Sequence, residues 1–307
     1  MSTINNAAIA AEFNLLDLTP EFIANPYPVY RALREHAPIK QMKNGSYFLT
    51  RYDDLIAIYK NPKSFSSDKK LEFKPKFGDS LLYEHHTTSL VFSDPPLHTR
   101  VRKLISGALT PRAIAGMESG LIKLVDGLLD RMQERSSKNG SVDLIEDFAS
   151  AIPIEVIGNL LDVPNDERAP LRAWSLAILG ALEPAVSAAA FESGNQAVAE
   201  FITYLEDLIA RRRKAPGNPD TDVLTRLIIG EADGEKLTPK ELLHNCIFLL
   251  NAGHETTTNL IGNGLVVLHD HPQQRALLVN QPDLIKTTIE EILRFESSNQ
   301  LGNRVTT

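Results

Sequence analysis

Residues 238–272 read TPKELLHNCIFLLNAGHETTTNLIGNGLVVLHDHP and predict one long helix over about 238–269. Thr238 and Glu241 form a capping-box pattern, in which each side chain satisfies a backbone amide of the first turn. At a rise of 1.5 Å per residue the helix is roughly 45 Å long, enough to cross the molecule. Over 242–253 it is apolar on nearly every side, so we expect it to be central and buried.

The rest of the chain continues the helical periodicity, interrupted mainly by proline. A short hairpin is expected over Ile39–Thr50, because Asn44-Gly45 favours a type I′ turn between two extended runs. We therefore predict a fold that is mainly α with a small β portion, in one domain whose β-containing N-terminal part covers about 1–65 and whose helical part covers about 94–296. Further helices are expected over about 118–136, 147–161, 166–181, 188–214, 221–230, 272–280 and 283–296.

Three segments between the helices attract attention. The segment over about 64–92 lacks periodicity and is too long for an ordinary connector, which predicts a binding loop. Asp94, followed by two prolines, predicts the N-cap of the next helix. Leu301–Thr307 looks like the start of a strand with no partner after it, which suggests that a segment is missing.

Composition limits the possible functions. The 307 residues include 32 Lys and Arg against 39 Asp and Glu, a net charge of −7, so nucleic acid is not expected as the main partner. The single cysteine, Cys246, excludes a disulfide framework and points to a reducing compartment, the cytoplasm. No apolar run reaches the roughly 18 residues that span a bilayer, so no membrane association is expected.

The middle of the long helix breaks local rules. Gly253 and the run Thr256–Thr258 are poor helix formers, and such conflicts often mark function. Gly253 would leave room for a flat ligand beside Ala252, and a threonine hydroxyl can bond a ligand or water. Glu255, in apolar surroundings, should have a raised pKa. The alternative is structural: Gly253 permits close helix packing and the hydroxyls bond their own backbone.

Metal binding is a rival interpretation of this region. His254-Glu255 begins the His-Glu-x-x-His pattern of zinc proteases, but Thr258 stands where the second histidine is required, so we reject that site. The other histidine clusters are expected in loops or at helix ends and are not predicted to bind metal: His85-His86 and His269 with His271.

Charged side chains elsewhere suggest anion binding. His98 and Arg102 lie at i and i+4 of one predicted helix, so they share a face and could grip a carboxylate together. Arg304, in the terminal extended segment, is a third possible anion-binding group. The alternative is a solvated helix face, the commoner role of a His-x-x-x-Arg pair.

Glu291 and Arg294 lie three residues apart and can form an ion pair. On a helix surface such a pair stabilises only slightly. Buried among further hydrogen-bond partners, it would act as a structural clasp.

In this order and at these separations, the motifs resemble those of the cytochrome P450 family of haem-thiolate monooxygenases, in its soluble bacterial form. Asp94–Leu104 is similar to the family's C helix, and Ala252–Thr257 to its I-helix signature. Glu291–Arg294 matches the Glu-x-x-Arg of the K helix, and Arg304 falls where the family has a second propionate-binding arginine. The resemblance covers essentially the whole chain.

The resemblance implies a haem b cofactor and a site built from several segments. Thr256 would help to deliver protons to dioxygen, and Glu255 would belong to the same relay. The loop over about 64–92 and the segment Ser297–Gly302 would line the pocket of a small organic substrate. Electrons would come from a ferredoxin or flavodoxin-like donor. The residues that the resemblance places against the haem are His98, Arg102, Arg304, Ala252 and Gly253.

One family feature does not appear in this sequence. The family's thiolate ligand lies in a Gly-rich loop well after the Glu-x-x-Arg helix, and the chain ends before such a segment. Cys246 lies ten residues before Thr256, in the wrong motif, and is predicted to be a buried apolar residue. We therefore expect a C-terminally truncated monooxygenase with no metal ligand in this chain, because the axial cysteine is absent. The alternative is a haem-free, non-catalytic helical remnant that binds an apolar ligand or a partner protein.

Overall fold

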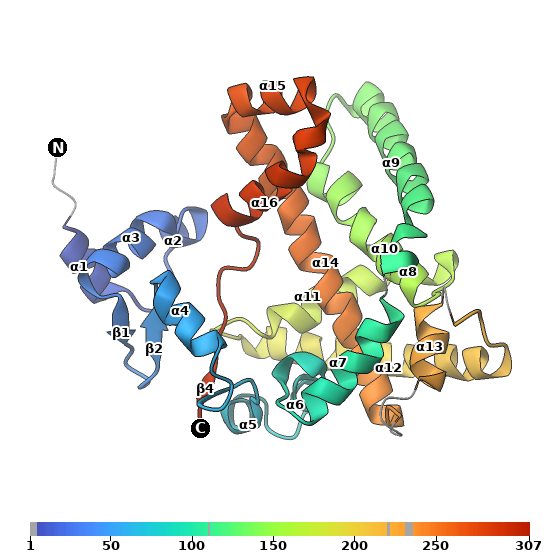
Figure 1. Ribbon diagram of the computed structural model, residues 1–307, viewed down its shortest axis with the longest axis horizontal. Coiled ribbons are helices and arrows are strands. Elements are labelled where there is room, and N and C mark those ends of the chain that lie inside the picture. The colour runs from blue at the N-terminus through green and yellow to red at the C-terminus, as the bar shows by residue number, and fades with distance from the viewer. Residues whose placement is uncertain (1–4, 110, 220–221, 231–235) are drawn as a thin grey trace.

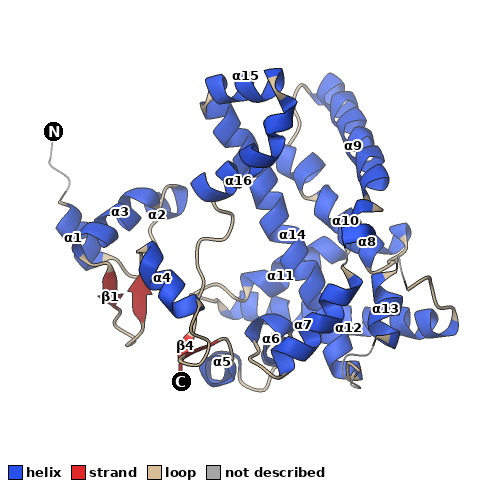
Figure 2. Ribbon diagram, viewed as in Figure 1, coloured by secondary structure: helices blue, strands red, loops and turns tan. Residues whose placement is uncertain are grey.

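The computed structural model describes residues 5–109, 111–219, 222–230 and 236–307. Most of these residues are helical and the strands are short, as Figure 2 shows. The predicted mainly α fold with a small β portion is therefore confirmed. Within the described ranges, no helix combines the length and the apolarity needed to cross a membrane.

The N-terminal elements form a small unit at one side of the molecule (Figure 1). Ala10, Ala32 and Leu33 are its buried residues, and Phe13 and Phe48 pack against them. This cluster is separate from the main core. The elements are α1 (Asn6–Glu12), α2 (Pro20–Ala24), α3 (Tyr27–His36), β1 (Ile39–Gln41), β2 (Tyr47–Leu49) and α4 (Tyr52–Tyr59).

The predicted hairpin is present, with a different turn. β1 and β2 pair antiparallel, with Ile39 opposite Leu49. Gly45 has a φ of 84° and its amide bonds to the carbonyl of Met42, whereas Asn44 is not among the described residues with positive φ. A type I′ turn needs positive φ at both central residues. The turn type that we expected is therefore wrong, and the single left-handed residue is the glycine.

The terminal extended segment is a paired strand, contrary to the sequence expectation. β4 (Val305–Thr306) pairs antiparallel with β3 (Phe65–Ser66). The hydroxyl of Thr307 also donates to the carbonyl of Lys63 at 2.9 Å. The partner strand is only two residues long and lies far away in the sequence, so no periodic pattern could reveal it.

The segment over 64–92 is largely helical and not the open loop that we expected. It contains β3, then α5 (Lys70–Phe77), α6 (Leu81–Thr88) and a 3-10 turn, η1 (Leu90–Phe92). Phe73, Phe77 and Leu82 are buried in the main core. The burial of these apolar side chains stabilises two short helices that the polar, lysine-rich sequence does not favour by itself.

The helix after Asp94 begins later than predicted. α7 (Leu97–Ala108) starts after Pro96, so Asp94 is not its N-cap. The Asp94 carboxylate instead accepts hydrogen bonds from the Ser66 hydroxyl and from the Ser67 amide, the latter at 2.9 Å. Because the Asp94 carboxylate oxygens accept these two bonds at the end of β3, they do not cap the first turn of α7.

The main core lies where α6, α10, α11, α12 and α14 meet, and α14 passes through the middle of the molecule (Figure 1). The capping box at its start is confirmed, because Thr238 accepts from the Glu241 amide and Glu241 accepts from the Thr238 amide. Residue 221, where one of the predicted helices (221–230) would begin, lies outside the described residues. The body is made of α8 (Pro111–Ala115), α9 (Glu118–Asn139), a π-helical turn (Ile145–Ala149), α10 (Ala151–Leu160), 3-10 turns at Asn165–Glu167 and Pro282–Leu284, α11 (Leu171–Gly180), α12 (Ala188–Lys214), α13 (Val223–Ile229), α14 (Pro239–Asp270), α15 (Pro272–Asn280) and α16 (Ile285–Phe295).

Candidate active site

The middle of α14 has one buried side and one exposed side. Asn251, His254 and Thr258 are buried, with exposed fractions of 6%, 1% and 7%. Ala252 and Thr256, four residues apart, are both exposed. A strip of a small apolar residue and a hydroxyl thus opens outward directly after a stretch of the helix, 242–250, whose residues are all buried or half-buried.

Gly253 lies on the side of α14 that packs against α10. A Cβ built on Gly253 would come within 2.7 Å of Cδ1 of Ile157, which is shorter than carbon atoms normally approach. The geometry therefore supports the structural alternative for this glycine, close packing of two helices. Ala252, and not Gly253, faces outward beside Thr256.

The threonine hydroxyls bond the preceding turn of their own helix. Thr256 donates to the carbonyl of Ala252 at 3.0 Å, and Thr258 donates to the carbonyl of His254 at 3.0 Å. Thr258 is buried, so its hydroxyl is used up within the core. The exposed hydroxyl of Thr256 keeps its acceptor lone pairs for a ligand or a water molecule.

Glu255 is half-buried beside this strip. Burial raises the pKa of its carboxyl, and the nearby carboxylate of Glu183 raises it further. The direction agrees with the expectation from the sequence. Such a carboxyl retains its proton at a higher pH than an ordinary glutamate, so it can act as a proton donor.

His254 is a buried residue whose contact the sequence did not indicate. Its Nδ1 lies 3.1 Å from the Ser175 hydroxyl on α11, and its Nε2 has no hydrogen-bond partner among the described residues. Burial, with a smaller effect of Arg172, lowers the pKa of His254 to about 4, so the ring is neutral. In the sequence, the helical spacing of His254 from Asn251 and Thr258 could have indicated that the three residues lie on one side of the helix. Among the described residues, no three histidine, cysteine or acidic side chains are grouped to hold a metal ion.

His98 and Arg102 lie one turn apart on α7, as predicted. His98 is half-buried and Arg102 is exposed, and neither side chain has a hydrogen bond or ion pair within the described part of the chain. Arg100 is occupied differently: its guanidinium binds Glu241 and the Lys236 carbonyl at the start of α14. The two adjacent side chains are thus available for an anion, while their neighbour fastens α7 to α14.

Arg304 lies near the start of α7. Its guanidinium carbon is 4.4 Å from the centroid of the Tyr59 ring, a cation–π contact that sequence reasoning missed. Three hydrogen bonds outweigh burial and lower the pKa of the Asp94 carboxyl, and the charge of Arg304 lowers it further. Because Asp94 precedes α7, the structure brings Arg304 and the beginning of that helix into electrostatic contact.

Glu291 and Arg294 form the predicted ion pair on α16. The guanidinium donates two bonds to the carboxylate, at 2.7 and 2.6 Å. Both side chains are more than half exposed. The surface alternative therefore holds here, and the pair is not a buried clasp within the described structure.

Known proteins share these motifs and this fold. The family model for Cytochrome P450 matches residues 181–294. The biotin biosynthesis cytochrome P450 of Bacillus subtilis (strain 168) is 34% identical over 288 residues, which cover 93% of this chain and 70% of that protein. The chain belongs to the cytochrome P450 family. One relative, PikC of Streptomyces venezuelae, is a cytochrome P450 monooxygenase, and the fold of this chain is that of a P450.

Two further P450 comparisons define how much of the family this chain represents. Vitamin D(3) 25-hydroxylase of Pseudonocardia autotrophica is 36% identical over 280 residues, 90% of this chain and 66% of that protein. A solved structure of P450BioI in complex with hexadec-9Z-enoic acid ligated acyl carrier protein superposes with a TM-score of 0.85 at 33% identity, and the match covers 94% of this chain and 73% of that one. The P450 chain thus spans about two thirds of the length of these relatives.

The family implies a haem, and the residues of this P450 chain fit one on its distal side. The exposed strip of Ala252 and Thr256 is the kind of surface that a flat ring covers, because a small side chain permits close approach. His98 and Arg102 offer donors to an anion without competing partners in the described structure. Arg304 adds a third cation near the start of α7.

Cys246 does not fit the role of the thiolate ligand in this P450 chain. It is fully buried on α14 among the residues of the main core. Burial raises the pKa of its thiol to about 12, so the thiolate is strongly disfavoured. The expectation that Cys246 behaves as a small apolar residue agrees with this geometry.

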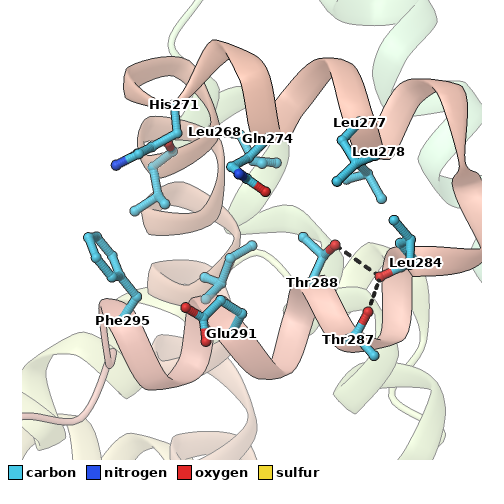
Figure 3. A pocket seen from close by; sticks show the side chains of 12 residues that line it. Leu268, His271, Gln274, Leu277, Leu278, Leu284, Thr287, Thr288, Glu291 and Phe295 are labelled. Atoms are coloured by element: carbon cyan, nitrogen blue, oxygen red, sulfur yellow. Dashed lines mark hydrogen bonds between the residues drawn. The ribbon is translucent and has the colours of Figure 1, made fainter.

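A groove of about 460 Å³ opens at the far end of α14, between α14, α15 and α16 (Figure 3). Leu277 and Leu278 line one side of it, and Leu284, Glu291 and Phe295 line the other. Its nearest residue on α14 lies eleven positions after Thr256, about 16 Å along the helix. The groove is therefore separate from the candidate active site.

Proposed function

We propose that this chain supplies the distal, haem-covering part of a haem-dependent monooxygenase, which inserts one oxygen atom of dioxygen into a small organic substrate. The observation that carries the proposal is the exposed strip of Ala252 and Thr256 in the middle of the central helix. A helix that is buried around this point has no structural reason to expose a strip at its centre, whereas a bound ring and substrate would cover it.

Three cationic or hydrogen-bonding side chains would hold the carboxylates of haem b. His98 and Arg102 share one face of α7, and Arg304 lies on the terminal strand near the start of that helix. Charge-assisted bonds from a guanidinium to a carboxylate are short and roughly twice as strong as neutral ones. When bound, the haem would supply the activation of dioxygen.

Glu255 and Thr256 would deliver protons beside the ring. The raised pKa of Glu255 keeps a proton on its carboxyl at a pH where an ordinary glutamate has lost it. The Thr256 hydroxyl donates to the Ala252 carbonyl, so its oxygen can accept a hydrogen bond from a water molecule. The side chains would thus orient a water between a proton source and the reacting oxygen.

The thiolate would have to come from a segment outside these 307 residues, because Cys246 is buried and protonated. An electron donor of the ferredoxin or flavodoxin type would complete the enzyme. The single, reduced cysteine supports a cytoplasmic location. The names of two relatives, a vitamin D hydroxylase and a P450 with a fatty-acyl carrier protein, support a largely apolar substrate.

A second candidate function is a haem-free helical protein that binds an apolar ligand or a partner. The groove between α14, α15 and α16 favours it, because leucine and phenylalanine side chains line an open surface. Leu277 and Phe295 are 42% and 44% exposed there. This candidate needs no haem and no proton relay.

Equilibrium titration of the purified chain with haemin separates the two candidates. We expect saturable binding, and we expect the double variant H98Q/R102Q to bind roughly 10- to 100-fold more weakly, since a hydrogen bond to a charged group contributes about 1.5–3 kcal/mol. The matched control H269Q/R275Q removes the same two residue types from exposed positions and should bind as the parent does. Absence of saturable binding by the parent would support the haem-free candidate, and equal affinity of H98Q/R102Q and the parent would contradict the role of His98 and Arg102.

A further inference from the structure

Three histidines meet beneath α6, outside the candidate active site. His85 and His86 lie on α6, and His244 lies in the second turn of α14. The ring of His85 is centred 5.1 Å from that of His86 and 5.6 Å from that of His244. The three side chains are 3%, 1% and 1% exposed. Their adjacent pair, which the sequence placed in a loop or at a helix end, is therefore part of the core.

The rings are short of hydrogen-bond partners. Nδ1 of His85, Nε2 of His86 and Nδ1 of His244 have no partner among the described residues. Nε2 of His244 lies 3.1 Å from the carboxylate of Glu84, whose other oxygen accepts from Lys240 at 2.9 Å. One carboxylate at the edge of the cluster thus serves one ring, and the inner rings have no anion to balance a positive charge.

Apart from the Glu84 carboxylate, the immediate surroundings of the cluster are apolar, uncharged or positively charged. From α5, Lys76 acts on His86 electrostatically, while Lys69 and Lys74 are paired with Glu72 and Asp79. α12 contributes the uncharged Asn195, which accepts from the Leu82 amide, and η1 consists of apolar residues. The rings of three phenylalanines surround His86, at centroid distances of 5.7, 5.4 and 5.9 Å: Phe73, Phe77 and Phe92.

The closed arrangement therefore requires neutral imidazoles. Burial lowers the pKa of His86 to about 3, with smaller effects of Lys76 and His244. Burial also lowers the pKa of His85 well below its ordinary value, and the two neighbouring histidines lower it further. For His244 burial outweighs the opposite effect of Glu84, so its pKa is also lowered. The ordinary value is 6.5, so the rings gain protons readily only where α6 is released.

We propose that His85, His86 and His244 form an acid-released latch that holds α6 against α14. At neutral pH the neutral rings pack together and keep α6 closed over α12 and α14. As the pH falls below 6.5, the released form binds protons that the closed form cannot, so acid shifts the equilibrium towards release. The latch is a property of this chain and does not depend on a bound haem.

Hydrogen exchange of the 307-residue chain tests the latch. Each proton taken up on release changes the opening equilibrium up to tenfold per pH unit, so the two rings of α6 give up to about a hundredfold per unit below pH 6.5, and His244 adds up to a further tenfold. We expect the protection factors of the amides in 81–88 to fall in this way between about pH 7 and pH 5, while those in 188–214 stay high. Protection in 81–88 that is independent of pH, or that falls together with that of 188–214, would overturn the proposal.

Two further measurements keep the test decisive. The variant H85F/H86F replaces the rings with apolar rings of similar shape and should lose the pH dependence in 81–88, whereas the control H269F, at an exposed site, should keep it. If H85F/H86F fails to fold, an NMR titration of the parent chain decides. The imidazole signals of the three latch histidines should not titrate near 6.5 while α6 remains protected. Titration at that ordinary value with α6 protected would overturn the latch.

Discussion

Replacing Gly253 with alanine tests why a glycine stands in the middle of α14. A Cβ there would lie 2.7 Å from Cδ1 and 3.1 Å from Cγ1 of Ile157 on α10. Carbon atoms normally approach no closer than about 3.5 Å, so the alanine requires a shift. Ile157 is 8% exposed and belongs to the main core, which limits how far it can move.

Two effects of the G253A substitution oppose each other. Alanine favours a helix interior over glycine by about 1 kcal/mol. Overpacking a core costs about 1–3 kcal/mol, so we expect a net loss of about 1 kcal/mol in the free energy of unfolding. I157V removes Cδ1 and alone costs about 0.5–1.5 kcal/mol. In the I157V background the 2.7 Å contact is removed and only the 3.1 Å approach to Cγ1 remains, so G253A should become close to neutral, with a coupling of about 1–2 kcal/mol.

Urea unfolding followed by far-UV circular dichroism measures these differences. G127A is the matched control, because Gly127 lies inside α9 and its added Cβ would meet only a guanidinium nitrogen of Arg131, at 3.6 Å. We expect G127A to stabilise by up to about 1 kcal/mol. If G253A stabilises as much as G127A, or if G253A and I157V are additive, close packing is not the reason for this glycine.

Three other substitutions or treatments have defined outcomes. T238A removes one half of the capping box of α14 and should cost about 1 kcal/mol in urea unfolding, whereas T203A, at an exposed helix-interior position, should cost less than about 0.5 kcal/mol. R168M should cost about 3 kcal/mol, because Arg168 is only 7% exposed and its guanidinium binds the Val163 carbonyl and the Asn159 side chain; a cost below 1 kcal/mol would contradict its structural role. The thiol of Cys246, with a pKa of about 12, should resist iodoacetamide in the folded chain and react in urea; prompt reaction without urea would show that the thiol is accessible.

The sequence predicts the helices whose ends carry local signals. The range 188–214 is correct to the residue, since Ser187 caps its start and basic residues fill its last turn. The range 272–280 is also correct, with Pro272 in its first turn. The helix expected from 166 begins only at Leu171, after Pro170, because a 3-10 turn occupies part of that stretch.

Features that depend on distant partners were not predictable in the same way. β4 exists because Phe65–Ser66 offers a strand edge, and α5 and α6 exist because their apolar side chains reach the core. Neither condition is visible in a local pattern. The same reason applies to Asp94, whose carboxylate is taken up by Ser66 and Ser67.

The candidate site likewise contains features that the local sequence pattern predicts and features that depend on distant segments. Helical periodicity places Ala252 and Thr256 on one strip and pairs His98 with Arg102 on one face, but it predicted a helix buried nearly all round at Ala252 and did not show that the strip is exposed. The contact that Gly253 makes possible comes from another helix, so the sequence left its role open between packing and ligand binding. Side-chain contacts between distant segments decide such cases, and only the folded chain shows them.

The central claim is that this chain can bind a haem on its distal side but cannot supply the thiolate. The reduced, carbon monoxide-bound absorption spectrum of the 307-residue chain, recorded after incubation with haemin, tests it most directly. We predict that haemin binds and that no red-shifted Soret band of the thiolate type appears, because Cys246 is buried and protonated. A thiolate-type Soret band would show that Cys246 ligates the iron and would contradict the account.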